Sequence, residues 1–313
     1  MVPTPSRRPV LVTGSNRSGT TWVGRMLCLS HELAYVHEPF NPGIWPRWIA
    51  EPVPYRNLYV CSENGGAYEG PVRAVLDRRF PWRRQLRDIR SVRDAARLAR
   101  DGIRHRFAHA ASRPTLMKDP IAVFSAEWLA DRFDMAVVMM IRGPVAFAGS
   151  VKRLSWKFDF GQWAHQPLLL RDHLGEFEAE IQQAAEAPPD ILTQAVLTWN
   201  ATYAYVDRMR TAHPDWHVVS YEDLAAAPAA GFESLFHDLG LSFDKRAAAG
   251  VARHSDRRNI GEVSPRDKGG IRRDSRTALG TWQRRLTPDE VEEVEQGTRA
   301  VAARLGLVAR GAQ

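Results

Sequence analysis

A glycine-containing loop near the start of the chain places the strongest constraint on the fold. The stretch GSNRSGTTW, Gly14 to Trp22, directly follows the apolar run VLVT, and the residues after it have helical spacing. The order strand, glycine loop, helix predicts an anion site built from backbone N–H groups at the helix start. The hydroxyls of Thr20 and Thr21 would add two hydrogen-bond donors to that site.

The loop has the spacing of a nucleotide phosphate loop but lacks its lysine. Gly14 and Gly19 match the pattern G-x-x-x-x-G-K-[ST], whereas Thr20 stands at the lysine position. Because that lysine contacts the β- and γ-phosphates of a nucleoside triphosphate, its absence argues against kinase or GTPase chemistry. Arg17 inside the loop still supplies a fixed charge with a planar set of donors. A plain strand–helix turn is the alternative, which the arginine and the two hydroxyls disfavour.

Strands alternate with helices along most of the chain, which predicts a parallel sheet covered on both faces. The fold class expected is α/β, a P-loop-type central parallel sheet flanked by helices, in one domain spanning 1–313. Residues 41–113 fit the alternation poorly and predict an irregular and helical insertion. The sequence predicts strands at 10–14, 33–38, 115–119, 135–143 and 216–224, and helices at 20–30, 122–133, 144–156, 191–213, 231–241 and 287–307.

The residues RSGTTW resemble the 5′-phosphosulfate loop of sulfotransferases that use 3′-phosphoadenosine 5′-phosphosulfate (PAPS). Cytosolic members of that family carry lysine at the Arg17 position, whereas tyrosylprotein enzymes and many bacterial members carry arginine. The resemblance to bacterial and carbohydrate-type sulfotransferases implies that Trp22 stacks on the adenine of PAPS. It implies that the phosphosulfate is bound by Arg17, Ser18, Gly19, Thr20 and Thr21.

A second anion motif is expected, because PAPS also carries a 3′-phosphate. In the family, this phosphate is bound by an arginine that ends a strand and a serine eight residues later. The stretch MIRGPVAFAGSVKR provides Arg142 and Ser150 at that spacing. Arg142 would project from the strand end and Ser150 would lie two turns into the helix, so both can face one phosphate. The segment VVSYEDL resembles the family segment whose tyrosine contacts the adenine region, here Tyr221.

The C-terminal stretch GTWQRRLTPDE resembles the G-x-W segment of the family, but the basic run that precedes it there is displaced. The basic residue that closes over the 3′-phosphate therefore stays open among Lys268, Arg272, Arg273 and Arg276, and Arg276 is the nearest to the G-x-W segment. The resemblance covers 9–40, with the phosphosulfate loop and base region, 115–155, with the 3′-phosphate motif, and 216–305, the C-terminal part of the donor site. The insertion 41–113 would lie on the acceptor side.

The general base is predicted near the end of the second strand. Tyrosylprotein, carbohydrate and bacterial relatives place a glutamate soon after the first helix, and YVHEPFNP provides Glu38 there. His37 is the alternative base; strand alternation predicts that it and Glu38 point to opposite faces. Lys118, after the third strand, would face the sulfate, although a solvated lysine at a strand end is nearly as good an interpretation.

The acceptor is expected to be a hydroxyl of a carbohydrate or glycolipid, because the HEPFN region resembles carbohydrate and bacterial enzymes. The reaction requires no metal. The net charge of +7 is concentrated between Arg73 and Arg113. This segment contains 13 arginines, no lysine and four aspartates. That segment is either a solvated helical face or a contact for an anionic surface. Aromatic residues are not interleaved with it, so no nucleic-acid partner is expected.

Two cysteines, Cys28 and Cys61, cannot form a disulfide framework, and no apolar run has the length of a signal or membrane segment. A cytoplasmic location is therefore expected, and the oligomeric state stays open. Two other function classes are weighed against a sulfotransferase. One is a P-loop small-molecule kinase, which would require ATP and Mg²⁺. The other is a non-catalytic binder of an anionic polymer through the arginine-rich segment.

Overall fold

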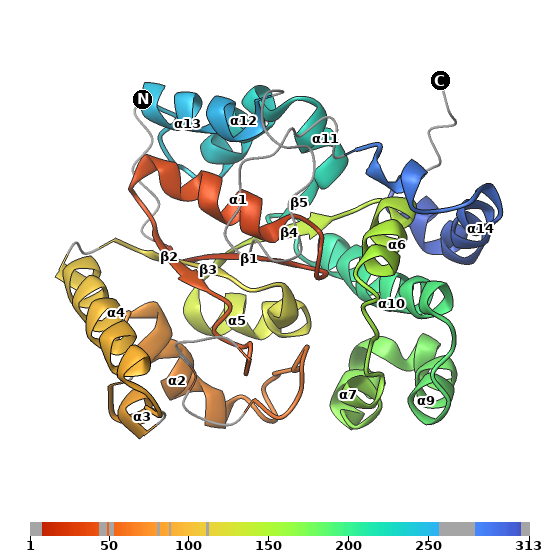
Figure 1. Cartoon of the computed structure of the whole chain (residues 1–313), viewed down its shortest axis with the longest axis horizontal. Helices are drawn as coiled ribbons and strands as arrows, with labels where there is room; N and C mark the ends of the chain where they lie inside the picture. Colours follow the sequence, from red (N-terminus) through yellow and green to blue (C-terminus); the bar gives the residue numbers. More distant parts are fainter. Residues whose placement is uncertain are drawn as a thin grey trace.

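A five-stranded parallel sheet forms the centre of the molecule, as the sequence predicts. The structure is a computed structural model that describes residues 8–43, 49, 53–79, 82–87, 89–110, 113–256 and 279–307. The strand order is β2-β3-β1-β4-β5, so the first strand lies in the middle (Figure 1). The strands are β1 (Val10–Gly14), β2 (Ala34–His37), β3 (Thr115–Lys118), β4 (Ala136–Ile141) and β5 (His217–Ser220).

The register of the sheet brings the ends of distant segments to one edge. Val10 pairs with Leu116 on one side and with Ala136 on the other, and His37 pairs with Lys118. Because all of these pairings are parallel, the carboxyl ends of the strands share an edge. Every predicted site residue that follows a strand therefore lies along that edge.

Helices cover both faces of the sheet, and β1 shows why. Val10 and Val12 contact one apolar cluster and Leu11 contacts the other, as period-two alternation requires. In Figure 1 the first cluster lies under the upper layer of helices. The four helices that contribute to it are α1 (Thr20–Leu27), α11 (Tyr221–Ala226), α12 (Pro228–Asp238) and α13 (Lys245–Ser255).

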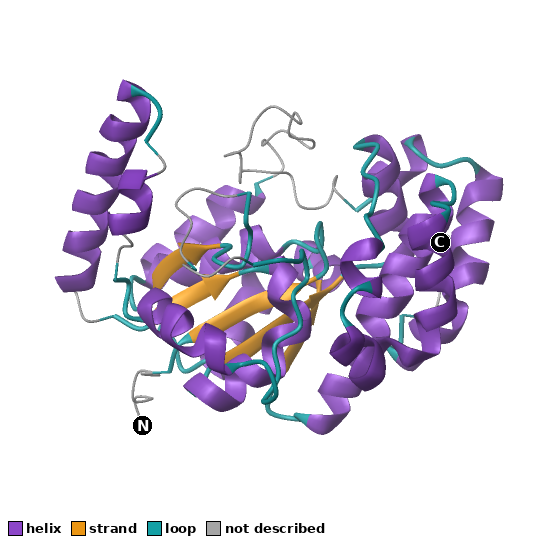
Figure 2. Cartoon of the chain, turned by 90° about the horizontal axis from the view of Figure 1, so that it is seen from below, coloured by secondary structure: helices purple, strands orange, loops and turns teal. Residues whose placement is uncertain are grey.

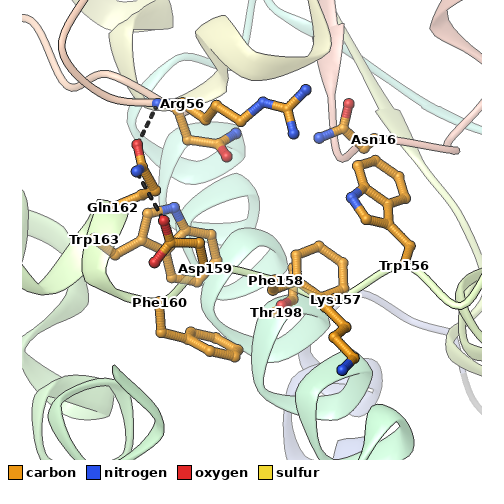
Figure 3. Close-up of a pocket in the computed structure, with 11 residues that line it drawn as sticks. Asn16, Arg56, Trp156, Lys157, Phe158, Asp159, Phe160, Gln162, Trp163 and Thr198 are labelled. Atoms are coloured by element: carbon orange, nitrogen blue, oxygen red, sulfur yellow. Dashed lines mark hydrogen bonds between the residues drawn. The ribbon is translucent and has the colours of Figure 1, made fainter. Parts of the chain in front are cut away.

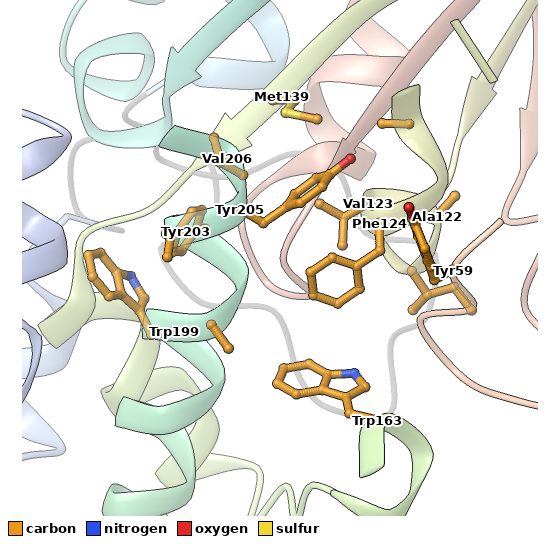
Figure 4. Packing of buried hydrophobic residues seen from close by; sticks show 14 of the residues in the cluster. Tyr59, Ala122, Val123, Phe124, Met139, Trp163, Trp199, Tyr203, Tyr205 and Val206 are labelled. Atoms are coloured by element: carbon orange, nitrogen blue, oxygen red, sulfur yellow. The ribbon is translucent and has the colours of Figure 1, made fainter. Parts of the chain in front are cut away.

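The second cluster is larger and contains most of the buried aromatic side chains. Trp199, Tyr203 and Tyr205 project into it from one long helix, and Phe124 and Trp163 approach from other segments (Figure 4). Several helices enclose it: α5 (Ala126–Phe133), α6 (Pro144–Arg153), α7 (Gly161–Ala164), α9 (Glu178–Glu186), α10 (Ile191–Ala212) and α14 (Pro288–Arg304). Among the described residues, no helix is both long and apolar enough to cross a membrane.

The predicted insertion is present and is partly helical. It contains α2 (Gly66–Leu76), α3 (Trp82–Arg87) and α4 (Val92–Ala110). Residues 53–61, before α2, are irregular, but they are tied to the rest of the domain. The backbone N–H of Tyr59 donates to Gln166 Oε1 at 2.8 Å, and that of Val60 donates to Ser125 Oγ at 3.1 Å. These bonds place one end of the insertion against the lower helices.

Several boundaries differ from the sequence prediction. The last strand was expected to run to Leu224, but β5 ends at Ser220, whose hydroxyl accepts the Asp223 N–H and so caps α11. Helix α13 was not predicted. Nor were the three helices between α6 and α10, which are α7, α8 (Pro167–Leu169) and α9. The helix predicted at 287–307 is present as α14, and Thr287 and Glu290 form a capping box at its start. Single turns follow or precede other helices: η1 (Cys28–Ser30), η2 (Pro120–Ser125), η3 (Leu170–Leu174), η4 (Gly175–Phe177) and η5 (Thr281–Arg284).

Candidate active site

The loop after β1 has a backbone shape that requires its glycines. Gly14, Arg17 and Gly19 all have positive φ, of 139°, 69° and 96°. A Cβ on Gly14 would lie 2.4 Å from Met140 O, and one on Gly19 would lie 2.5 Å from Tyr221 Cδ2. Arg17 adopts its left-handed conformation at a cost that glycine would not have, so the loop spends stability to place that side chain.

Hydrogen bonds hold the loop at the sheet edge. Ser18 Oγ donates to Ser15 O at 2.7 Å, and Ser15 Oγ shares a 2.7 Å hydrogen bond with the hydroxyl of Tyr203. Gly19 then caps α1 without any side-chain hydrogen bond to the first turn. A helix start that no side chain caps leaves its N–H groups available for an anion. Thr20 is buried in this turn and Thr21 is half-buried.

The two predicted anion motifs meet in the structure. Arg17 Nε donates to Ser150 Oγ at 3.1 Å, and Arg142 Nη1 donates to the carbonyl of Arg17 at 2.6 Å. Arg142 is only 8% exposed, and its buried Nε has no hydrogen-bond partner in the described part of the chain. A buried charged donor without a partner is costly, so this atom marks a place for an anionic ligand.

Arg285, which the sequence reasoning missed, joins this positive region. Burial, with the charges of Arg153 and Arg142, lowers the pKa of Arg285 to about 10. Its turn, η5, packs on α6 where Gly149 faces Trp282, next to Ser150. The sequence signal was the pair of arginines after the G-x-W segment. Lys268, Arg272, Arg273 and Arg276 lie outside the described residues.

Aromatic rings border the loop on the α12 side of the sheet. The ring of Trp22 is edge-on to Tyr221 at 5.8 Å and to Phe232 at 5.0 Å, measured between centroids. The guanidinium carbon of Arg142 lies 4.9 Å from the centre of the Tyr221 ring. Trp22 is half-buried rather than a core residue, so one part of its ring reaches the surface beside the loop. The structure thus groups Trp22 and Tyr221 with both anion motifs.

Glu38 lies at the other end of the same edge, where β2 stops. Its φ of 44° ends the strand, and its N–H donates to Lys118 O at 2.7 Å. Its carboxylate is ion-paired with Lys118 Nζ and accepts a 2.7 Å hydrogen bond from Asn41 Nδ2. The expectation that His37 and Glu38 point to opposite faces was wrong. His37 Nε2 is 3.8 Å from Glu38 Oε1, because the left-handed backbone turns Glu38 back toward β3.

The electrostatics keep Glu38 ionised and His37 neutral near pH 7. Burial pushes the pKa of Glu38 up, but Lys118 and Asn41 outweigh it and the pKa is lowered. Burial, then the charge of Lys118, lowers the pKa of His37 to about 4. Burial also lowers the pKa of Lys118, against the attraction of Glu38. Lys118 is fully buried, which rules out the solvated lysine that the sequence left open.

Asp119 is a further acidic residue near Glu38, and the sequence alone did not predict a role for it in the site. It is fully buried and accepts the N–H groups of Phe40 at 2.7 Å and Ile121 at 3.1 Å. Burial, with the charge of Glu38, raises the pKa of Asp119 to about 7. It therefore fixes the chain just after Glu38 in place. No sequence pattern marked it, because Phe40, the partner that ties it to the site, is 79 residues away.

A cavity opens beside the loop (Figure 3). The space between its lining side chains is about 480 Å³, a volume that includes solvent outside its mouth. Asn16 of the loop borders it, Trp156 and Phe158 form an aromatic wall after α6, and Thr198 of α10 lies at its back. Among the described residues, no group of three His, Cys, Asp or Glu side chains is placed to hold a metal ion.

Comparison with known proteins gives a family and a fold. A family model described as the sulfotransferase family matches residues 9–245. A sulfotransferase domain from the curacin biosynthetic pathway superposes with a TM-score of 0.51 at 14% identity, covering 97% of this chain and 99% of its own. That likeness supports the fold.

Two further solved structures are similar at lower scores. A sulfotransferase domain from the olefin synthase of Synechococcus PCC 7002 has a TM-score of 0.45 at 16% identity, covering 94% and 96% of the two chains. A sulfotransferase from Mycobacterium tuberculosis has a TM-score of 0.42 at 18% identity, covering 94% and 77%. A search of curated proteins found no significant match.

Proposed function

Because this chain belongs to the sulfotransferase family, we propose that it transfers a sulfuryl group from PAPS to a hydroxyl of an acceptor. The observation that carries the proposal is the meeting of Arg17, Ser150 and Arg142 at the mouth of the β1 loop. A donor with a 5′-phosphosulfate and a 3′-phosphate needs two anion sites side by side, and these residues supply them.

The donor would bind across the edge of β1 and β4. Residues 17–21 would hold the 5′-phosphosulfate with loop N–H groups, the two threonine hydroxyls and the Arg17 guanidinium. Arg142, Ser150 and Arg285 would hold the 3′-phosphate, and Trp22 and Tyr221 would contact the adenine. The fit rests on Arg142 Nε, which is buried without a partner among the described residues and which a bound anion would satisfy. Gly14 and Gly19 support it indirectly, because they let the loop pack closely against Met140 and Tyr221.

Glu38 is the proposed general base. The acceptor oxygen attacks sulfur, its proton passes to the Glu38 carboxylate, and the bond from sulfur to the bridging oxygen of the 5′-phosphate breaks. 3′,5′-Bisphosphoadenosine leaves with the electron pair of that bond, where Arg17 and the loop amides stabilise the growing charge. Two strand spacings separate β2 from β1, about 10 Å, which leaves room for the sulfuryl group and the acceptor between them.

Lys118 would act mainly on Glu38 rather than on the sulfate. Its ion pair with Glu38 Oε1 is buried and keeps the base ionised and pointing along the sheet edge. His37 stays the alternative base, because it is neutral and lies 3.8 Å from the same oxygen. We further propose that the acceptor is a carbohydrate or a glycolipid and that no metal takes part.

Donor binding can be tested by thermal unfolding with 3′,5′-bisphosphoadenosine in the presence of EDTA. At a hundred times its Kd, a ligand of the folded state adds about 2.7 kcal/mol, or roughly 5–10 °C for a domain of this size. The kinase alternative instead predicts stabilisation by ATP with Mg²⁺. No response to bisphosphoadenosine would overturn the proposal. Incubation with radiolabelled PAPS and source-cell extract would then identify the acceptor by its label.

A further inference from the structure

The cavity behind the loop is placed to receive the acceptor. Asn16, within the loop, borders it, while Trp22 and Tyr221 lie with the apolar cluster on the other face of the sheet. Phe160 and Trp163, at the far side of the cavity, belong to the cluster on the α10 face. A ligand in the cavity would therefore approach the loop from the side opposite to the proposed adenine site.

One wall of the cavity is aromatic and rigid. The rings of Trp156 and Phe158 are stacked, with centroids 5.4 Å apart and planes 19° apart. Phe160 and Trp163 extend this wall with an edge-on contact of 5.8 Å. Because Trp156 and Phe158 already cover one face of each other, the wall offers a single apolar surface rather than a slot between two rings.

The remaining lining is polar and is held in a fixed position. The Arg56 N–H donates to Gln162 Oε1, and Gln162 Nε2 donates to Asp159 Oδ2, each at 2.9 Å (Figure 3). These bonds tie the insertion to the aromatic segment. Two other lining side chains, Asn16 and Lys157, have no hydrogen-bond or ion-pair partner within the part of the chain that the structure describes.

Thr198 gives the most specific signal. Its side chain is 5% exposed, it lines the cavity from α10, and its Oγ1 has no hydrogen-bond partner among the described residues. A buried hydroxyl without a partner destabilises a fold unless a ligand supplies the missing hydrogen bond. The ligand must therefore offer a hydroxyl at depth, an apolar face for the aromatic wall and further polar groups for the rim.

We propose, resting on the function above, that this cavity binds a sugar ring of the acceptor. One face of a pyranose ring would lie against Trp156, whose other face Phe158 covers, and its hydroxyls would bond to Thr198 Oγ1 and to the side chains of Asn16 and Asn57. An aryl acceptor would leave those groups without partners, so the lining selects a polyhydroxylated ring. Trp156 and Thr198 are then specificity-determining residues.

The test uses the full chain saturated with bisphosphoadenosine and titrated with methyl glucoside, methyl galactoside and p-nitrophenol. Ligand-observed NMR measures binding. We expect at least one glycoside to bind, Thr198→Val and Trp156→Ala to weaken it tenfold or more, and p-nitrophenol to bind more weakly. Thr198→Val removes the unpaired hydroxyl at nearly constant shape, so its melting temperature should not fall. Trp128→Phe, outside the cavity, is the control and should bind like the wild type.

The proposal is overturned if neither glycoside binds, if both variants bind as the wild type does, or if p-nitrophenol alone binds. These results are separable from those for the donor. Stabilisation by bisphosphoadenosine without glycoside binding would refute only the sugar subsite, whereas the reverse would refute the sulfotransferase proposal. Octyl glucoside below its micellar concentration distinguishes the sources: tighter binding than methyl glucoside assigns the ring to a glycolipid, and equal binding to a free saccharide.

A second surface carries an independent proposal. All large apolar side chains that are exposed in the described residues lie on α3 and α4: Trp82 at 43%, Leu86 at 57%, Val92 at 86% and Ile103 at 56%. These helices lie at one side of the molecule beyond the edge strand β2, and α4 stands apart from the two helical layers (Figures 1 and 2). Exposed apolar groups gathered in this way mark an interaction surface.

The faces of α4 are sharply divided. Leu98 is buried, and Gly102, one turn later, is covered by the Trp82 ring, so this face holds α3. At 100° per residue, Val92 and Ile103 lie together on another face with the exposed alanines 95, 96 and 99, and Arg93 and Arg100 both border it on the side away from Leu98. An exposed apolar stripe with arginines along one side is typical of a helix that lies in a membrane interface.

We propose that the α3–α4 surface binds an anionic lipid bilayer. From Trp82 to Ala110, over α3 and α4, the sequence has nine arginines and three aspartates, so this part carries six net positive charges, which complement anionic headgroups. The exposed Val92 and Ile103 favour a bilayer over a soluble polyanion, which offers no apolar phase for them. The proposal does not depend on the sugar subsite, although a bilayer would be the source of a glycolipid acceptor.

Cosedimentation of the full chain with vesicles tests this surface. We expect binding to phosphatidylcholine vesicles that contain phosphatidylglycerol, little binding to pure phosphatidylcholine, and at least tenfold weaker binding for the double variant Val92→Asp/Ile103→Asp. Ala229→Asp/Ala230→Asp, on the exposed surface of α12, changes the charge equally and should bind like the wild type. Equal binding by both double variants, no binding to anionic vesicles, or a dimer that the Val92/Ile103 variant dissociates would overturn the proposal.

Discussion

The two halves of the carboxyl edge differ in how they handle charge. At β1 and β4, Arg17 donates to Ser150, Arg142 donates to the carbonyl of Arg17, and the charge of Arg142 lowers the pKa of Arg285. Burial raises the pKa of the nearby Glu222, against the charge of Arg142, so this acid is less readily ionised. At β2 and β3, the charges of Glu38 and Lys118 neutralise each other in a buried pair. One half thus groups several arginines, one with a buried donor without a partner among the described residues, whereas the other pairs its lysine with a glutamate.

This difference assigns separate tasks to the two halves. A group of arginines that includes a buried, unpartnered donor such as Arg142 Nε is suited to an anionic ligand, which would supply the missing hydrogen bond. A neutral ion pair gains little from a second anion, but it holds a carboxylate ionised and oriented for proton transfer. The comparison therefore predicts that substitutions in one half act on donor binding and that those in the other act on turnover.

Glu38→Gln should give the largest effect. Loss of the base is expected to lower the single-turnover rate by about 10²–10⁴, with bisphosphoadenosine stabilising the protein as in the wild type. Lys118 would then be buried without its carboxylate, which costs about 3–5 kcal/mol of stability. The double variant Glu38→Gln/Lys118→Met should recover stability but not turnover. An active Glu38→Gln enzyme would contradict the assignment of Glu38 as base.

Arg17→Ala is expected to give the second largest loss of rate. Removing a donor aimed at the leaving phosphate typically costs about 10²–10³ in kcat. Arg17→Lys keeps the charge and corresponds to the residue of cytosolic relatives, so it should recover part of the rate. Steady-state kinetics with saturating donor measure both variants. Equal rates for the alanine and wild-type enzymes would show that the charge at this position does not stabilise the transition state.

Arg285→Ala should act on binding alone. Loss of one charge-assisted hydrogen bond to the 3′-phosphate, about 1.5–3 kcal/mol, raises the donor KM roughly 10–100-fold and leaves kcat nearly unchanged. Arg284→Ala, the neighbour in the same turn, is the matched control and should change KM little. A fall in kcat with KM unchanged would place Arg285 in the catalytic half instead.

Substitution of His37 should give the smallest effect on turnover. The direction in which His37 changes stability with pH follows from its lowered pKa. The folded pKa of about 4 lies below the usual value near 6.5, so the neutral form is favoured in the fold. Stability from this group is present above pH 6.5 and is lost as the pH falls toward 4. In His37→Gln, the melting temperature should depend less on pH between 6.5 and 4 than in the wild type. Turnover at pH 7.5 should change less than tenfold. A larger loss of turnover would favour His37 as base.

Most of the fold followed from local patterns. Strand and helix periodicity placed all five strands, and the glycine spacing located the anion loop. Local patterns failed where a helix starts directly after a strand, as at Tyr221, and in α13, whose buried residues Ala247, Gly250 and Val251 are small. The place of Thr198 beside Trp156 could not be predicted either, because Thr198 lies in α10, Trp156 follows α6, and no motif links them.

The site divides in the same way. Arg17, Arg142 and Ser150 could be proposed as site residues because each lies at a fixed offset from a strand end. Arg285 and Asp119 could not, since their roles depend on partners brought close by the sheet. Glu38 and His37 were placed in the right strand, but their relative direction was wrong. A single left-handed residue reverses the alternation on which that direction was based.

The sequence by itself determined the order of elements, the loop that only glycine permits at two positions, and the charge carried by each segment. These are local properties, fixed by side-chain period and by steric limits on φ. Only the tertiary structure decided that Arg17 meets Ser150 and that Lys118 meets Glu38, pairs separated by 133 and 80 residues. Those contacts depend on strand order and register, which set which carboxyl ends are neighbours and which no local stretch of sequence contains.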